Sequence, residues 1–129
     1  MSLFVCKWKK EFGQDVKDNI RHDICEGFGK LNGIDPKYFA VLFEDYPAGD
    51  FSDQGIGVFV LVYQSEGKTD AYKDEEVTVI TDAFCKYTGW QNDRVSIQIV
   101  DIRQGSLGFK GRIVNRGGTG ADAVKSGDL

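Results

Sequence analysis

The sequence predicts an α/β (α+β) fold in which two βαβ units follow each other along the chain. Two apolar runs, at 3–6 and 58–61, each open a stretch that ends in a second run rich in β-branched and aromatic residues, at 38–44 and 94–102. Between the two runs of each pair, apolar residues recur with helical spacing, and this segment stops at a polar residue followed by glycine. A strand–helix–strand pattern that occurs twice favours a sheet with helices packed on it.

The first half is predicted to hold two strands around one helix. In the strand at 3–10, apolar and polar side chains partly alternate. The helix begins near Gln14, and an apolar residue at every fourth position places one stripe along it. The stripe residues are Val16, Ile20, Ile24 and Phe28. Gly33 and Pro36 end the helix. The strand that follows at 38–44 is apolar on both faces, as a strand covered on both sides should be.

The second half repeats this order after a long polar connection. Residues 44–57 are rich in Asp, Gly, Ser and Pro, which predicts a loop. A strand at 58–63 leads into a turn at 64–68, and Thr69 or Asp70 then caps the second helix. The predicted buried stripe of this helix is Val77, Ile80, Phe84 and Tyr87. The last strand places three apolar residues on one face: Val95, Ile97 and Ile99.

Together these elements predict a single domain over 1–129, with halves at 3–44 and 58–102 and a C-terminal hairpin and tail at 103–129. A chain of 129 residues is long enough to bury one core without disulfides or metals. The tail is too rich in glycine for a helix, so we expect a short hairpin around 109–113 followed by a loose end.

Two arrangements of the strands fit two βαβ units. One is the ferredoxin-like sandwich, whose halves interleave in an antiparallel sheet. In the other, each half keeps its two strands parallel. The long connection at 44–57 favours the second arrangement, because the link between the second and third strands of ferredoxin-like folds is usually a short hairpin. We therefore expect a four-stranded mixed sheet with two helices on one face.

Composition excludes several functional classes. The chain is 41% hydrophobic and 28% charged, as is ordinary for a folded domain, and its net charge of −4 argues against nucleic acid or a membrane surface as partner. No apolar stretch reaches the length of a spanning helix and no signal-peptide pattern opens the chain, so a cytoplasmic location is expected. Cys6, Cys25 and Cys85 are predicted to be buried free thiols. With one histidine, His22, expected on the surface, neither a metal site nor a cofactor is expected.

Several short motifs resemble the tautomerase superfamily. They are Pro47-Ala48-Gly49-Asp50 in the connecting loop, Gly55 and Gly57 before a strand, the turn at 66–73, and Phe109-Lys110-Gly111-Arg112 near the C-terminus. They are most similar to the long-chain branch of cis-3-chloroacrylic acid dehalogenase and malonate semialdehyde decarboxylase. The resemblance implies a tautomerase (MIF-like) fold and a homotrimer. It also implies an isomerase-like activity on small 2-oxo acids or unsaturated carboxylates.

The resemblance also implies a site at the start of the first strand. Family members use a proline there as the first residue of the mature chain. Its secondary amine lies in an apolar pocket that lowers the pKa, so the amine acts as base or acid near neutral pH. This sequence begins Met1-Ser2-Leu3 and carries no proline at that point. The corresponding group is then the primary amine of Ser2 or Met1. Two interpretations stay open: this is the native start, or it is a cloning scar that replaced an N-terminal proline.

The other catalytic positions of the family are only partly matched. Lys68 stands at the second arginine of the family's turn, which binds the substrate carboxylate. A lysine neutralises a carboxylate but does not grip it with two parallel hydrogen bonds. Ser65 stands at the first arginine, and Phe28 stands where the dehalogenases have a histidine. Residues 106–108 occupy the place of the acid that activates water, so hydrolytic dehalogenation is not expected.

Three further residues are predicted to line the ligand site by resemblance. Tyr38 opens the second strand, where the family lines its pocket, although a core role is the simpler alternative. Arg103 and Arg112 would supply positive charge from a neighbouring subunit, or else form ion pairs at the subunit contact. Ser2 and Lys68 are thus predicted as catalytic, with Lys68 also binding substrate.

Three functional hypotheses follow from these patterns. The first is a tautomerase-superfamily enzyme that uses the N-terminal amine and Lys68. The second is a non-catalytic trimer that lost the proline and only binds a small anion. The third is a ferredoxin-like binding module, which would have antiparallel pairing between its halves and form no ring.

Overall fold

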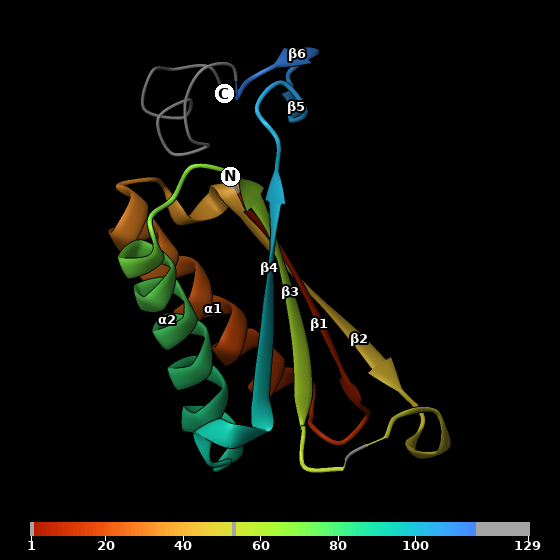
Figure 1. The fold of residues 1–129 in the computed structure, drawn as a ribbon. Coiled ribbons are helices and arrows are strands. Elements are labelled where there is room, and N and C mark those ends of the chain that lie inside the picture. The colour runs from red at the N-terminus through yellow and green to blue at the C-terminus, as the bar shows by residue number, and fades with distance from the viewer. Residues whose placement is uncertain (1, 53, 116–129) are drawn as a thin grey trace.

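The structure is a computed structural model of the chain and describes residues 2–52 and 54–115. Four strands form one sheet in the order β2-β1-β3-β4, and both helices cover the same face of it (Figure 1). The main elements are β1 (Ser2–Lys9), α1 (Gln14–Asn32), β2 (Phe39–Tyr46), β3 (Val58–Ser65), α2 (Asp70–Thr88) and β4 (Val95–Ile102). A small hairpin of β5 (Gly108–Phe109) and β6 (Arg112–Ile113) follows, as the sequence predicts. Short 3₁₀ turns occur at Pro36–Tyr38, Ala48–Asp50 and Asn92–Arg94.

Strand directions decide between the two predicted arrangements. β1 runs parallel to β2, and β3 runs parallel to β4. The two halves meet where β1 pairs antiparallel with β3. Each half is therefore a βαβ unit with adjacent parallel strands, and the interleaved ferredoxin-like alternative is wrong.

The core lies between the helices and the sheet. Ile20, Ile24 and Phe28 of the predicted α1 stripe are fully buried. In α2, Ile80 and Phe84 are buried, whereas the outer members of the predicted stripe, Val77 and Tyr87, are only partly covered. Burying side chains of this size stabilises a fold by about 1.5–3 kcal/mol each relative to exposure. The helices are thus held by this one shared core.

Local signals fix the helix ends. Both helices stop at a glycine in the left-handed region, Gly33 with φ 65° and Gly89 with φ 76°. The Thr69 side chain accepts a hydrogen bond from the backbone N–H of Tyr72 and so caps α2. Among the described residues, no helix is both long and apolar enough to cross a membrane. Of the predicted C-terminal tail, residues 116–129 lie outside the described part of the chain, as does Met1.

The face of the sheet away from the helices carries apolar side chains that nothing in the described part of this chain covers. Leu3 is 37% exposed, Leu42 50% and Val100 39%, and they come from three different strands. A sheet face that looked only onto water would carry mainly polar residues. This outer face is therefore suited to contact with other protein surface.

Candidate functional site

The residues predicted for the site gather at one end of the sheet, where β1 starts. Ser2 is 4% exposed and pairs with Phe39, the residue after Tyr38. One step beyond the Leu3–Tyr63 pair of β1 and β3, Ser2 comes opposite the end of β3. β4 ends at the same edge of the sheet, so Arg103 and the β5–β6 hairpin with Arg112 follow there (Figure 1). The fold thus brings distant parts of the sequence to a common end.

Lys68 lies beneath this end as part of a buried polar cluster. Its side chain is only 7% exposed. The ammonium donates to Glu76 Oε2 at 2.9 Å, to Gln64 Oε1 at 3.0 Å and to Asn32 Oδ1 at 3.3 Å. It also lies 5.1 Å from the centre of the Tyr72 ring. An ammonium has three N–H groups, and each has a partner here.

The other members of the cluster are also satisfied. Gln64 donates through Nε2 to the second carboxylate oxygen of Glu76 at 3.1 Å. The Tyr72 hydroxyl lies 2.7 Å from Asn32 Oδ1 and 2.9 Å from the Leu31 carbonyl oxygen, either of which can accept its proton. Burial, reinforced by the nearby carboxylates of Glu76 and Glu75, raises the pKa of Tyr72 to about 12. The cluster is therefore closed, with one positive charge balanced by one negative charge.

This arrangement changes what is expected of Lys68. The sequence pattern predicts a cation that is free to bind a substrate carboxylate. In the structure that place is taken by the carboxylate of Glu76, which is 1% exposed. A ligand carboxylate would have to displace a buried negative charge, which is unfavourable unless that charge finds another partner.

Asn115 fastens the C-terminal segment to the same end. Its side chain is 0% exposed and accepts hydrogen bonds from the backbone N–H groups of Gly105 and Leu107 at 3.0 and 3.1 Å. It donates to the Arg103 carbonyl oxygen at 3.0 Å and to Ser65 Oγ at 3.2 Å. Ser65, which the resemblance aligns with an arginine, is buried and accepts one of these hydrogen bonds from Asn115.

The remaining predicted site residues lie at the surface of this end. Arg103 is exposed, and among residues 2–52 and 54–115 its guanidinium has no carboxylate partner. Arg112 is exposed on the hairpin. Tyr38 is half-buried, with the Lys37 ammonium 5.2 Å from its ring centre. His22 is a surface residue, its side chain 71% exposed.

Three members of the buried cluster are not among the predicted site residues, yet each continues an apolar pattern. Asn32 extends the four-residue stripe of α1 beyond Phe28. Gln64 follows Val58, Val60 and Val62 on the helix-facing side of β3. Glu76 precedes Ile80 by one helical turn. A polar residue at a position that the periodicity assigns to the core is the signal that would have located the cluster.

The three cysteines are free, but only Cys6 is fully buried, whereas Cys25 and Cys85 are half-buried. Burial raises the pKa of the Cys6 thiol to about 12, so it carries no thiolate near neutral pH. No group of three or more His, Cys, Asp or Glu residues in the described part of the chain is arranged to hold a metal ion.

Comparison with solved structures identifies the fold. The F6 fused 4-OT asymmetric trimer matches with a TM-score of 0.77 at 14% identity, over 86% of this chain and 94% of that chain. Pt0534 inactivated by 2-oxo-3-pentynoate matches with 0.78 at 16% identity and the same coverage. Malonate semialdehyde decarboxylase matches with 0.70 at 17% identity, over 98% of both chains. No family model and no curated protein matches the sequence. The predicted tautomerase-like fold is therefore confirmed, as a structural match at low sequence identity.

Proposed function

We propose that this chain forms a tautomerase-fold ring that binds a small carboxylate, a 2-oxo acid or an unsaturated acid, and does not turn it over efficiently. One observation carries the proposal. The ammonium of Lys68 donates a hydrogen bond to the buried carboxylate of Glu76 at 2.9 Å, which occupies the charge that a ligand carboxylate would need. The side chain that matches the family's anchor is therefore part of the folded framework. Positive charge for a ligand then comes from Arg103 and Arg112 at the surface of the same end.

The ring is part of this proposal. Leu3, Leu42 and Val100 leave the outer sheet face partly apolar, and three copies around an axis would cover it. The fused 4-OT structure that matches this chain is described as a trimer. In such an assembly the exposed hairpin of one copy would bring its Arg112 toward the Ser2 end of the next.

A second candidate is catalysis by the amine of Ser2 after removal of Met1. The observation in its favour is that Ser2 begins β1 and is 4% exposed. An α-amine has an unperturbed pKa of about 8, and burial lowers the pKa of an amine, so this group would be a usable base near neutral pH. It is nevertheless a primary amine without the ring of proline, and we expect it to tautomerise slowly.

Two measurements on the same protein separate these candidates. Phenylpyruvate binding is followed by calorimetry, and ketonisation of phenylenolpyruvate is followed by absorbance. We expect saturable binding that Arg103→Gln weakens and Lys110→Gln, an exposed cation on the hairpin, leaves unchanged. Turnover typical of enzymes, on the order of 1–10³ per second, would favour catalysis instead.

The Ser2→Pro variant tests whether a proline at the start of β1 is enough to give the protein tautomerase activity. After removal of Met1 it presents a cyclic secondary amine at the start of β1. We expect it to gain tautomerase activity and to form a covalent adduct with 2-oxo-3-pentynoate, located on the N-terminal proline of the variant by peptide mass spectrometry. A variant that folds and binds phenylpyruvate but stays inert would mean that the site has diverged beyond the amine.

A further inference from the structure

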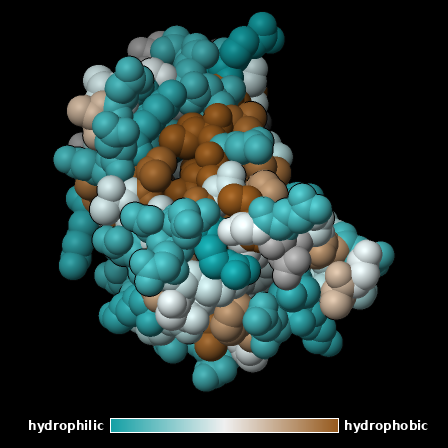
Figure 2. Space-filling model, turned by 60° about the horizontal axis from the view of Figure 1, so that its bottom comes forward, coloured by the Kyte–Doolittle hydropathy of each residue, from teal (hydrophilic) through white to brown (hydrophobic). Residues whose placement is uncertain are grey.

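A pocket lies on the outer sheet face at the end opposite Ser2. Its volume is about 400 Å³, and it forms where β1 and β2 end and β3 begins. The apolar part of its lining comes from Tyr46, Phe51, Ile56 and Phe59. Figure 2, which turns this end toward the viewer, shows a continuous hydrophobic area bordered by hydrophilic residues. In the ring proposed above, which covers the outer face, this pocket would lie at a contact between copies.

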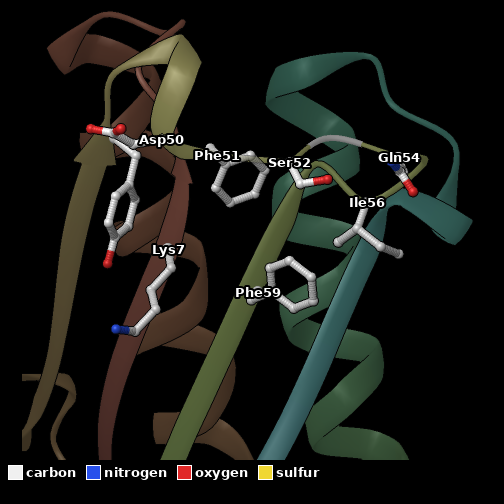
Figure 3. Close-up of a pocket in the computed structure, with 8 residues that line it drawn as sticks. Lys7, Asp50, Phe51, Ser52, Gln54, Ile56 and Phe59 are labelled. Atoms are coloured by element: carbon white, nitrogen blue, oxygen red, sulfur yellow. The ribbon is translucent and has the colours of Figure 1, made fainter.

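Three aromatic rings form one wall of this pocket. The Phe51 ring centre lies 6.3 Å from that of Tyr46 and 6.0 Å from that of Phe59, in tilted arrangements. In Figure 3 the rings of Phe51 and Phe59 lie between Lys7 on one side and Ile56 on the other. Such a wall suits an apolar side chain, which is stabilised by burial without a specific hydrogen-bond partner.

The charges beside the pocket are of both signs. On the ends of β1 and β2 and in the residues directly after them, the charged side chains are Lys7, Lys9, Lys10, Glu11, Glu44, Asp45 and Asp50. The ammonium of Lys7 points away from the rings (Figure 3) and is paired with Glu44 at 3.1 Å. Cations and carboxylates in similar numbers select neither an acidic nor a basic occupant, so the apolar wall determines what fits.

Leu42 is the side chain of the outer face that is best placed to fill the pocket of another copy. It is 50% exposed, more than Leu3 and Val100 on the same face. It lies on β2, an edge strand of the described sheet, so a second copy can approach it from the side. Leu3 and Val100 lie in one row at the Ser2 end, because both are in register with Tyr63.

We propose that Leu42 of one copy packs against Phe51 and Phe59 in the pocket of the next copy, and that this contact closes the ring. The proposal rests on the ring of the proposed function and names the contact that forms it. In a ring, each copy offers Leu42 to one neighbour and its pocket to the other. The same two patches could also meet twice across a two-fold axis, and the assembly would then stop at a dimer.

Disulfide cross-linking tests which copies meet. The variant Leu42→Cys/Phe51→Cys is made in a chain that also carries Cys25→Ser and Cys85→Ser, which remove the half-buried native thiols. After oxidation with oxidised glutathione we expect covalent species up to the trimer on a denaturing gel, because each copy is bonded to two neighbours. The matched control is Phe51→Cys with Thr78→Cys, on the exposed side of α2, and it should stay monomeric on the gel.

Dilution followed by light scattering measures the strength of the contact. Phe51→Ala should raise the concentration at which half of the copies are assembled by about tenfold, because an aromatic side chain at the centre of a contact carries much of its free energy. Leu31→Ala removes a half-buried apolar side chain from α1, on the side of the sheet that the ring does not cover. It should leave that concentration unchanged.

The outcomes separate this contact from the ring itself. A trimeric wild type whose cysteine variant forms no disulfide between copies overturns the Leu42 contact and leaves the ring standing, as do equal effects of Phe51→Ala and Leu31→Ala. Cross-linking that stops at a dimer indicates a two-fold contact and overturns the arrangement proposed here. A wild type that is monomeric by light scattering removes the ring, and this contact with it.

Discussion

The fold buries the charged side chain of Lys68, of which only 7% is exposed. Such a pair with Glu76 adds little net stability, because desolvation of both ions offsets most of their attraction. Its value lies in what happens when one partner is removed, because the other then stays buried without a counter-charge. The pair is thus a constraint on sequence more than a source of stability.

Replacing Lys68 by methionine should destabilise the protein by about 3–5 kcal/mol, because Glu76 is left buried and unpaired. The double variant Lys68→Met/Glu76→Gln should recover part of this loss, since glutamine keeps a hydrogen bond to Gln64 without a charge. Urea denaturation measures the free energies of unfolding of the wild type, Lys68→Met and the double variant. Lys73→Met is the control: its pair with Asp101, at 3.0 Å, is more exposed and should be worth less than about 1 kcal/mol. Equal losses for Lys68→Met and Lys73→Met would contradict the buried-pair account.

Tyr72 should make stability fall at alkaline pH. Burial, and next the carboxylates of Glu76 and Glu75, raise its pKa from the ordinary value of 10.0 to about 12 in the folded state. The folded state therefore holds the phenolic proton longer, so this contribution is complete below pH 10 and is lost as pH rises from 10 to 12. We expect Tyr72→Phe to flatten the pH dependence of the free energy of unfolding in that window. Tyrosinate absorbance should also lose a component that titrates near pH 12 in Tyr72→Phe.

Apolar periodicity predicts the core of this chain well and the cluster poorly, for a physical reason. Ile20, Ile24 and Phe28 are recognised because the hydrophobic effect is not directional, so an apolar side chain is stabilised by burial without a specific partner. Whether Asn32 or Glu76 at a core position finds a hydrogen-bond partner depends on segments far along the chain, and a single helix does not reveal that. The same limit applies to Lys68, because its buried partner Glu76 comes from α2 and the turn motif around Lys68 does not reveal it.

Among the elements, the β5–β6 hairpin follows a segment that is held to the end of the sheet by the Asn115 side chain, by the buried Val114 and by a hydrogen bond from the Gln104 N–H to Glu66. The Asn115 side chain makes three hydrogen bonds to the segment after β4, at Arg103, Gly105 and Leu107, and one to Ser65 at the end of β3. The turn residues around 109–113 predict the hairpin itself, because they act locally. Its attachment depends on a contact across fifty positions of sequence, which no local pattern carries.

Asn115→Ala should release the hairpin without unfolding the sheet. The backbone N–H of Leu107 loses its side-chain acceptor, so its hydrogen exchange should become much faster, while exchange in β1 and β3 stays slow. The N–H of Gly105 keeps the backbone carbonyl oxygen of residue 115 as an acceptor at 3.2 Å, so its exchange should change less. Asn115→Asp keeps the acceptor oxygen but loses the donor to Ser65 Oγ and to the Arg103 carbonyl oxygen, so its exchange rates should lie between those of the wild type and of Asn115→Ala. Uniformly faster exchange across β1 and β3 would instead mean that Asn115 stabilises the whole domain.

For the whole molecule, the decisive feature is a sheet with one face in the core and the other partly apolar and uncovered. The helices account for the first face. On the second, Leu42 is half exposed in the single chain and lies on the edge strand β2, which pairs only with β1 in the described sheet. Edge strands that carry apolar side chains invite contact with another chain.

We therefore expect three copies to assemble, with a mass by light scattering of three times the 14.4 kDa chain. Leu42→Lys should shift this equilibrium toward the monomer, because a charge would be buried at the contact, and it should leave the fold intact, because residue 42 is exposed in the single chain. Thr78→Lys, on the exposed side of α2, is the matched control and should remain assembled. A wild-type chain that stays monomeric at micromolar concentration would contradict the ring. In that case Arg112 on the hairpin could not complete the Ser2 end of a neighbour, and carboxylate binding would have to depend on Arg103 of the same copy.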